Sequence, residues 1–141
     1  MELIEIKFGS DLYAKELELR NGVLRKPIGL KYSEADLQNE SVYRHFGLLL
    51  ENHLAACLMV VPHPGEVFQI RQMAVRSDLQ GRGYGRFLMT AVEAVLRKGT
   101  VTRVFLNARG TAIDFYSKLG YQPVGGIFTE VGVPHLRMEK D

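Results

Sequence analysis

The sequence predicts an α/β (α+β) fold, with a mixed central sheet of about seven strands flanked by about four helices, in a single domain over residues 1–141. Three observations predict it. Several short stretches alternate apolar and polar residues, as half-buried strands do. Other stretches place apolar residues three and four apart, as amphipathic helices do. One such helix lies between two apolar strands, an arrangement that usually forms a right-handed parallel crossover.

The chain starts with a strand and a helix. Residues 3–8 ("LIEIKF") alternate apolar and charged side chains, which predicts a strand. Residues 10–25 follow as a helix, with Ser10 or Asp11 as the N-cap. The apolar residues at helical spacing in this segment are Leu12, Leu17 and Leu19.

An antiparallel group of strands is expected next. Residues 27–42 are polar and poorly periodic, so we expect a loop with one short helix. Residues 45–62 predict two strands joined by a tight turn near Glu51 and Asn52, because asparagine favours turns. Residues 67–75 form the third strand of this meander. Its alternation places Gln69 and Arg71 on one face and Ile70 and Gln72 on the other.

The second half alternates helices and strands. It is expected to contain a helix over 84–98, a strand over 103–108, a helix over 111–120, and strands over 121–130 and 134–140. Thr111 and Asp114 resemble a capping box, and Gly120 is a helix stop. The predicted order is therefore β-α-α-β-β-β-α-β-α-β-β, with a parallel step from 67–75 to 103–108.

Composition limits the possible functions. Hydrophobic residues make up 46% of the chain and charged residues 24%, and the net charge is +2. Because nucleic-acid-binding domains carry a concentrated basic face, we expect no nucleic acid partner. Cys57, the single cysteine, lies in an apolar run and is expected to be buried and inert. No long apolar run or signal-peptide pattern is present, so we expect a cytoplasmic protein without a membrane partner.

Three glycines within five residues lie at the start of the helix over 84–98, in the stretch "QGRGYG" of residues 80–85. The first amides of a helix lack partners and carry partial positive charge, which makes a phosphate site. Glycine allows positive φ and lets a ligand approach the backbone. Arg82 and Arg86 add positive charge. The alternative is a glycine-rich turn that only connects strand to helix.

The spacing excludes two common phosphate motifs and matches a third. It fits neither the G-x-G-x-x-G dinucleotide fingerprint nor a P-loop. It matches [RQ]-x-x-G-x-[GA] through Gln80, Gly83 and Gly85, and "LNARGTAIDFYSKLGY" follows at residues 106–121. Together these motifs resemble the Gcn5-related N-acetyltransferase (GNAT) superfamily, which implies a GNAT-like sheet. "LRNGVLRKPIG" and "VPHLRMEK" resemble its ElaA-like branch.

The resemblance implies an N-acetyltransferase that uses acetyl-CoA as co-substrate, with no metal. The acetyl group would pass to a primary amine, on a small molecule or a peptide, by direct attack through a tetrahedral intermediate. Tyr116 would be the general acid that protonates the leaving thiolate. The cofactor-binding residues that the resemblance implies are Met73, Ala74, Val75, Gln80, Gly81, Arg82, Gly83, Tyr84, Gly85, Arg86 and Asn107. The resemblance allows both a monomer and a homodimer.

Several assignments stay open at this point. The general base that deprotonates the amine is one of Glu66, His45, His135 or Glu130, or a chain of water molecules. Arg76 either supports the phosphates or is a solvated strand end. Asn107 either contacts the cofactor or completes a strand-to-helix turn. The alternative for Tyr116 is a core aromatic whose hydroxyl bonds a carbonyl. Arg71 either binds an acidic group on the substrate or pairs with a neighbouring acid.

The alternative function is a catalytically weak acetyl-CoA sensor or a protein-interaction module. An RNA-binding domain would need basic residues gathered on one face with interleaved aromatics, whereas those of this chain are scattered.

Overall fold

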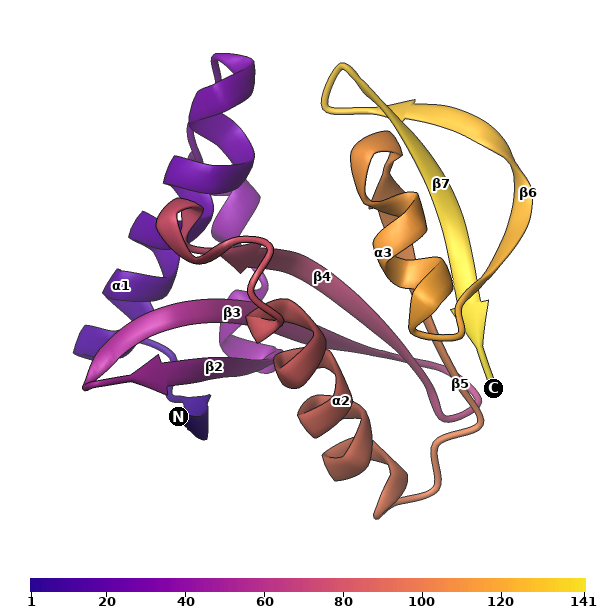
Figure 1. Ribbon diagram of the computed structural model, residues 1–141, viewed down its shortest axis with the longest axis horizontal. Helices are drawn as coiled ribbons and strands as arrows, with labels where there is room; N and C mark the ends of the chain where they lie inside the picture. Colours follow the sequence, from indigo (N-terminus) through magenta and orange to yellow (C-terminus); the bar gives the residue numbers. More distant parts are fainter.

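A computed structural model describes residues 1–141, which form one mixed sheet of seven strands with helices on both faces (Figure 1). The strands are β1 (Glu2–Ile6), β2 (Arg44–Leu50), β3 (His53–His63), β4 (Val67–Val75), β5 (Arg103–Arg109), β6 (Gln122–Glu130) and β7 (Val133–Lys140). Their spatial order is β1-β2-β3-β4-β5-β7-β6. Only β4 and β5 pair in parallel, and every other pair is antiparallel. The predicted fold class and the parallel step are confirmed.

Three α-helices accompany the sheet, and no helix is long and apolar enough to cross a membrane. They are α1 (Asp11–Arg20), α2 (Tyr84–Arg97) and α3 (Ile113–Lys118). The π-helical segment η1 (Asn21–Arg25) continues α1. Single 3₁₀ turns are η2 (Lys26–Ile28), η3 (Ala35–Leu37), η4 (Glu40–Val42), η5 (Ser77–Leu79) and η6 (Gly110–Ala112). The short helix expected within residues 27–42 is present only as such turns.

Of three predicted turn and cap features, the hairpin turn and the helix stop are confirmed, and the capping box is not. Glu51 and Asn52 both have positive φ (51° and 66°), as a two-residue hairpin turn requires. Gly120 ends α3 with φ of 96°. The capping box was wrong, because α3 starts at Ile113 after a 3₁₀ turn and its N-cap, Ala112, has no side-chain hydrogen bond.

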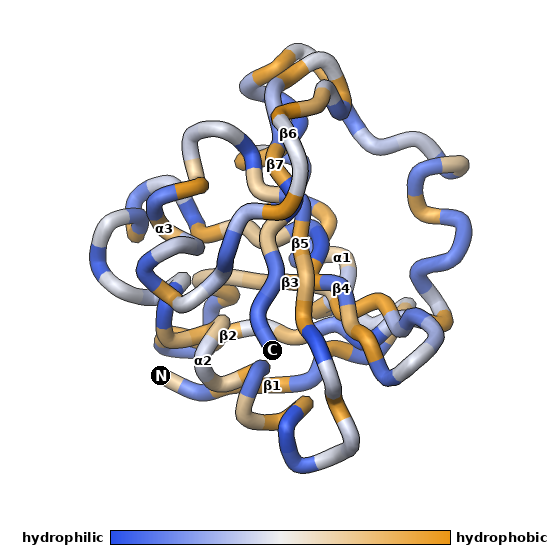
Figure 2. Tube along the Cα trace, turned by 90° about the vertical axis from the view of Figure 1, so that its right-hand side faces the viewer, coloured by the Kyte–Doolittle hydropathy of each residue, from blue (hydrophilic) through white to orange (hydrophobic).

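The apolar core lies between the sheet and α2. Leu88, Met89, Val92 and Leu96 of α2 are each at most 4% exposed, and they pack against alternate residues of the central strands. Burying one such side chain contributes about 1.5–3 kcal/mol. Figure 2 shows the matching concentration of hydrophobic residues along β5. This layer holds the start of α2 against the sheet.

The opposite face of the sheet is covered by α1, which buries a polar surface. Ser10 caps the helix as predicted, since its Oγ accepts a hydrogen bond from the Tyr13 amide at 3.2 Å. The buried residues of α1 are Tyr13, Glu16 and Arg20. The leucine spacing therefore identified the helix but not its buried face, because Leu12, Leu17 and Leu19 are only partly buried.

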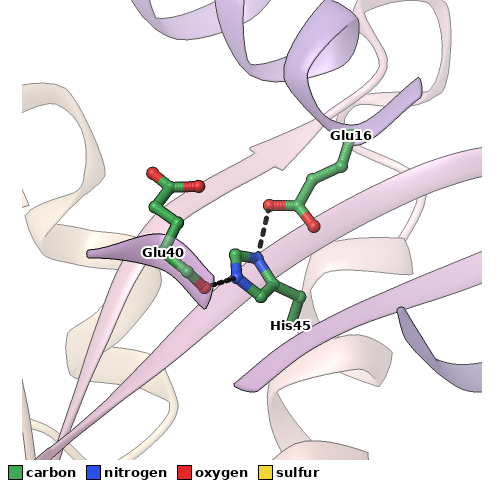
Figure 3. A group of neighbouring side chains, drawn as sticks. All are labelled: Glu16, Glu40 and His45. Atoms are coloured by element: carbon green, nitrogen blue, oxygen red, sulfur yellow. Dashed lines mark hydrogen bonds and ion pairs between the residues drawn. The ribbon is translucent and has the colours of Figure 1, made fainter. Parts of the chain in front are cut away.

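Four charged side chains form a buried cluster under α1, which we call the charge cluster: Glu16, Arg20, Glu40 and His45. Figure 3 shows three of them, with Glu16 from α1 and His45 from β2 pointing toward each other. Arg20 donates to Glu16 Oε2 at 2.9 Å and to both oxygens of Glu40, at 2.7 and 2.6 Å. The ligand atoms of Glu16, Glu40 and His45 lie within 4.8 Å of one another. The Arg20 guanidinium already holds these carboxylates, and its charge would repel a metal cation.

The surroundings of His45 in this cluster favour its charged form. Its Nδ1 lies 2.9 Å from Glu16 Oε2 and its Nε2 lies 2.8 Å from the Glu40 carbonyl, so both ring nitrogens face acceptors. Burial alone lowers the pKa of His45, but the hydrogen bonds to Glu16 and Glu40 and the negative charge of both outweigh burial and raise it. When His45 is protonated, two cations balance two anions in the cluster. His45 is 1% exposed and does not line the cleft described below, so it is not positioned to act as the general base.

The charge cluster predicts a pH-dependent stability. The folded pKa of His45 lies above the unfolded value of about 6.5, so its stabilisation is complete below pH 6.5 and is lost as pH rises through the folded pKa. Unfolding free energy measured with urea should therefore fall above pH 6.5. In a His45→Gln variant, the unfolding free energy should fall less steeply above pH 6.5. Parallel curves for the two proteins would show that His45 does not carry a buried charge.

Candidate functional site

A β-bulge in β4 sets the geometry of the site. Cys57 of β3 pairs with Ala74 and Met59 pairs with Arg71, so two residues of β4 oppose Leu58 alone. One of the two, Gln72, has φ of 56°, a conformation that costs a non-glycine residue roughly 1–2 kcal/mol. The parallel pairing of β4 with β5 ends just before it, at Ile70 opposite Leu106. Because bulges bend the strand that carries them, β4 and β5 separate from this point on.

The bulge also reverses which face the following residues occupy. Ile70 belongs to the core beneath α2, whereas the Gln72 side chain accepts a hydrogen bond from the Tyr32 hydroxyl on the α1 face. The prediction that Gln72 shares a face with Ile70 was therefore wrong. After the bulge, Met73 and Val75 face α2 and pack against Gly85.

The separated edge of β4 exposes backbone groups toward β5. The Arg76 amide donates to the Ala55 carbonyl of β3 at 2.8 Å, so the amide of Arg76 points away from β5. Because successive backbone groups of a strand point in opposite directions, those of Met73 and Val75 point into the gap. A cleft of about 970 Å³ occupies this gap. In Figure 1, β4 and the β5–β7 group diverge from the lower right.

The start of α2 lies at this cleft without a cap. Its N-cap residue, Gly83, has φ of 88° and provides no side-chain hydrogen bond. The first helical bond runs from the Phe87 amide to the Gly83 carbonyl at 3.0 Å. The amides of Tyr84, Gly85 and Arg86 therefore have no partner within the helix, which is the backbone arrangement of an anion site.

The three glycines have two different roles. Gly81 and Gly83 have φ of 78° and 88°, and a Cβ on either would meet no atom within 4 Å. They are required for backbone conformation. Gly85 is required for packing, since its Cβ would lie 3.2–3.3 Å from side-chain atoms of Met73, Val75 and Phe115. Gly85 therefore lets α2 approach β4 closely.

Ten of the eleven residues predicted to bind the cofactor line the cleft, and so does Tyr116. Those ten are Met73, Ala74, Val75, Gln80, Gly81, Gly83, Tyr84, Gly85, Arg86 and Asn107. The exception, Arg82, is exposed and does not line it. Gln80 lies at the cleft but uses its side chain to hold the turn, donating to the Val75 carbonyl at 3.1 Å. Arg76 pairs with Asp78 at 2.7 Å and lies outside the cleft.

Tyr116 presents its ring to the cleft from α3. The side chain is 7% exposed and packs edge-on against Phe115, with ring centroids 4.9 Å apart. Its hydroxyl makes no hydrogen bond within the protein, unlike that of Tyr121, which donates to Glu93 at 3.1 Å. Burial raises the pKa of Tyr116 above its ordinary value. The hydroxyl therefore stays protonated at neutral pH.

Two of the four residues considered as general base line the cleft, namely Glu130 and His135. His135 Nδ1 lies 2.9 Å from the Val133 carbonyl, so this nitrogen is the donor. Its Nε2 lies 3.5 Å from Glu130 Oε2. Glu66 is exposed in the β3–β4 turn and does not line the cleft.

Sequence reasoning missed part of the cleft wall. Val23, Leu24 and Arg25 of η1 line it, as does Arg109 at the end of β5. The sequence patterns place residues 19–25 at the end of the first helix, and they do not predict that this segment borders the site. The basic residue at position 109 directly follows the Asn-Ala of the later motif and was the available signal.

The comparisons with known proteins agree with this geometry. YjcF of Bacillus subtilis, an uncharacterized N-acetyltransferase, is 32% identical over 74 residues, which cover 52% of this chain and 53% of YjcF. A solved protein from Lactobacillus plantarum is 25% identical with a TM-score of 0.86, covering 99% of this chain and 96% of the other. Escherichia coli ElaA is 23% identical with a TM-score of 0.85 and full coverage of both chains.

One further solved structure of this fold, 14% identical with a TM-score of 0.77, has acetyl-CoA bound. The matched stretch spans about half the length of YjcF, so that similarity concerns one region of that protein. The profile of the acetyltransferase (GNAT) family, whose members are acyl-CoA-dependent N-acyltransferases, matches residues 11–121. With the split strands, the uncapped helix and both sequence motifs, this match shows that the chain belongs to the acetyltransferase (GNAT) family.

Proposed function

We propose that this protein transfers an acetyl group from acetyl-CoA to a primary amine on a small molecule or a peptide. The observation that carries the proposal is the uncapped start of α2 beside the separated edges of β4 and β5. A family relative of the same fold holds acetyl-CoA, which supports the same co-substrate for this chain. Acetyl-CoA would supply the activated thioester.

The residues present fit the two ends of this co-substrate. The amides of residues 81–86 would hold the pyrophosphate, since three of them have no helical acceptor and Arg86 adds charge. The backbone of Met73 and of Val75 would pair with the pantetheine amides, as an added strand pairs with a sheet edge. Gln80 already occupies the Val75 carbonyl, so the Val75 amide and the Met73 groups are the ones left to bind.

The same backbone edge would assist the reaction. An amide near Met73 pointing into the gap would stabilise negative charge on the thioester oxygen, and a single donor of this kind is worth about 3–4 kcal/mol in other enzymes. The bulge at Gln72 lies directly beside it. A donor held by a rigid strand needs no reorganisation when the charge develops.

Tyr116 would protonate the departing thiolate. Its side chain lines the cleft, and its hydroxyl has no partner in the protein and is kept protonated by burial. Either Glu130 or His135, on the opposite strand pair, would accept the one proton that the ammonium loses. Acid and base thus lie on different elements of one cleft.

Release of free thiol from acetyl-CoA in the presence of an amine panel tests the activity. Amine-dependent release supports the enzyme. Binding of acetyl-CoA without release for any amine would instead support the alternative of a cofactor sensor.

The proposed binding of pyrophosphate by residues 81–86 is tested by two substitutions at Gly83. We expect Gly83→Glu to abolish the thermal stabilisation that acetyl-CoA provides, because the carboxylate would occupy the proposed pyrophosphate site. At a hundredfold excess over Kd this stabilisation is about 2.7 kcal/mol, on the order of 10 °C for a domain of this size. Gly83→Asn is the control, since asparagine tolerates positive φ and adds no charge. An unchanged shift in Gly83→Glu would place the phosphates elsewhere.

The role of Tyr116 is tested by removing its hydroxyl. We expect Tyr116→Phe to lower kcat by about 100-fold or more, the usual contribution of a positioned proton donor, with little change in the KM for acetyl-CoA. Tyr121→Phe removes a hydroxyl that does not reach the cleft and should leave kcat unchanged. Equal kcat values in Tyr116→Phe and the unmodified protein would exclude this acid.

A further inference from the structure

Basic side chains dominate the cleft. Five line it, whereas the only acidic side chain there is Glu130. The five are Arg25, Arg71, Arg86, Arg109 and Lys118. The whole chain has a net charge of only +2, so this concentration is local.

Three of these residues lie on the face of the sheet opposite α2. Arg71 pairs with Met59 of β3 and Arg109 pairs with His135 of β7, and the neighbours of these residues belong to the core beneath α2. Arg25 belongs to η1, which follows α1. The proposed pyrophosphate site is the start of α2, on the other face of the sheet. The three arginines are therefore placed at the acceptor end of the cleft.

Arg109 is a partly buried charge without a carboxylate partner. Its guanidinium donates to the Leu24 carbonyl of η1, and it forms no ion pair with a carboxylate. Burial lowers the pKa of Arg109 and so does the positive charge of Arg25, while the negative charge of Glu130 opposes them weakly. Because no carboxylate pairs directly with this partly buried charge, an anion bound at this position would be favoured.

The other two guanidiniums are also available. Arg71 is exposed and makes no hydrogen bond or ion pair within the protein. Arg25 stacks on the Tyr32 ring at 4.4 Å, and its nearest carboxylate, that of Asp36, is 4.0 Å away. The Arg71 side chain on β4 and the Arg109 side chain on β5 thus lie on the two sides of the gap where the strands separate.

We propose that the acceptor is a primary amine that also carries an anionic group, a carboxylate or a phosphate, bound by Arg71 and Arg109. This inference rests on the proposed acetyl transfer. Guanidinium forks match both groups with paired, charge-assisted hydrogen bonds. The amino end of such an acceptor would lie near Glu130 and His135, because Arg109 is directly opposite His135 in the β5–β7 register. The acceptor would thus be amphoteric.

Matched amine pairs test this proposal. The rate of thiol release is compared for amino acids and their amides, for β-alanine and β-alaninamide, and for 2-aminoethylphosphonate and 2-methoxyethylamine. We expect the anionic member of at least one pair to have a kcat/KM higher by about tenfold or more, as a charge-assisted hydrogen bond implies. The carboxylate and phosphonate pairs identify which anion is bound.

Three variants give the contrast. Arg71→Ala removes an exposed side chain, and Arg109→Gln keeps a donor for the Leu24 carbonyl. Each should bring the ratio within the preferred pair close to one by raising the acceptor KM, with the KM for acetyl-CoA unchanged. Arg97→Ala is the control, since Arg97 is exposed on α2 away from the cleft.

Two results would overturn the proposal: neutral amines acetylated as well as anionic ones, or an anion preference that survives both Arg71→Ala and Arg109→Gln. Where no amine is acetylated, the same pairs are compared by thermal shift in the presence of CoA, and equal shifts would also overturn it. Absence of any acetyl-CoA-induced shift marks a failure of the proposed function itself.

Discussion

The bulge at Gln72 is the constraint on which the site depends. It ends the pairing of β4 with β5 and turns Met73 and Val75 toward α2. It also leaves a row of backbone groups without a neighbouring strand. A regular β4 would pair with β5 along its length, and the cleft would close. The positive φ at Gln72 destabilises the local backbone. Such strain is typical of functional sites, and here it lies where the backbone itself would bind the ligand.

The charge cluster under α1 is connected to this bulge. Arg20, whose charge is balanced by Glu16 and Glu40, lies over the Tyr32 ring with its Cζ 4.8 Å from the centroid. The Tyr32 hydroxyl in turn donates to Gln72. A buried ionic group is a weak source of stability but holds a defined geometry. The cluster thus fixes α1 and, through Tyr32, supports the strained residue at the edge of the cleft.

Sequence patterns predicted the parts of this protein that depend on local chemistry. Alternating and continuous apolar runs located the strands, and helical spacing located α2. The glycine motif predicted an anion site at the start of that helix. The sequence patterns failed where contacts between residues far apart in the chain determine the structure. The buried face of α1 is polar because Arg20 meets Glu40, twenty residues away. The bulge at Gln72 has no glycine to signal it. The contact of Arg109 with η1 joins residues 85 positions apart, through the Leu24 carbonyl.

The central claim is that the uncapped amides at the start of α2 and the free edge of β4 together bind acetyl-CoA. A crystal structure of the complex with CoA tests it most directly. We expect pyrophosphate oxygens within hydrogen-bond distance of the amides of residues 81–86, and pantetheine amides paired with the backbone of Met73 and Val75 in the gap. A complex in which the nucleotide and its arm contact neither element would contradict the account.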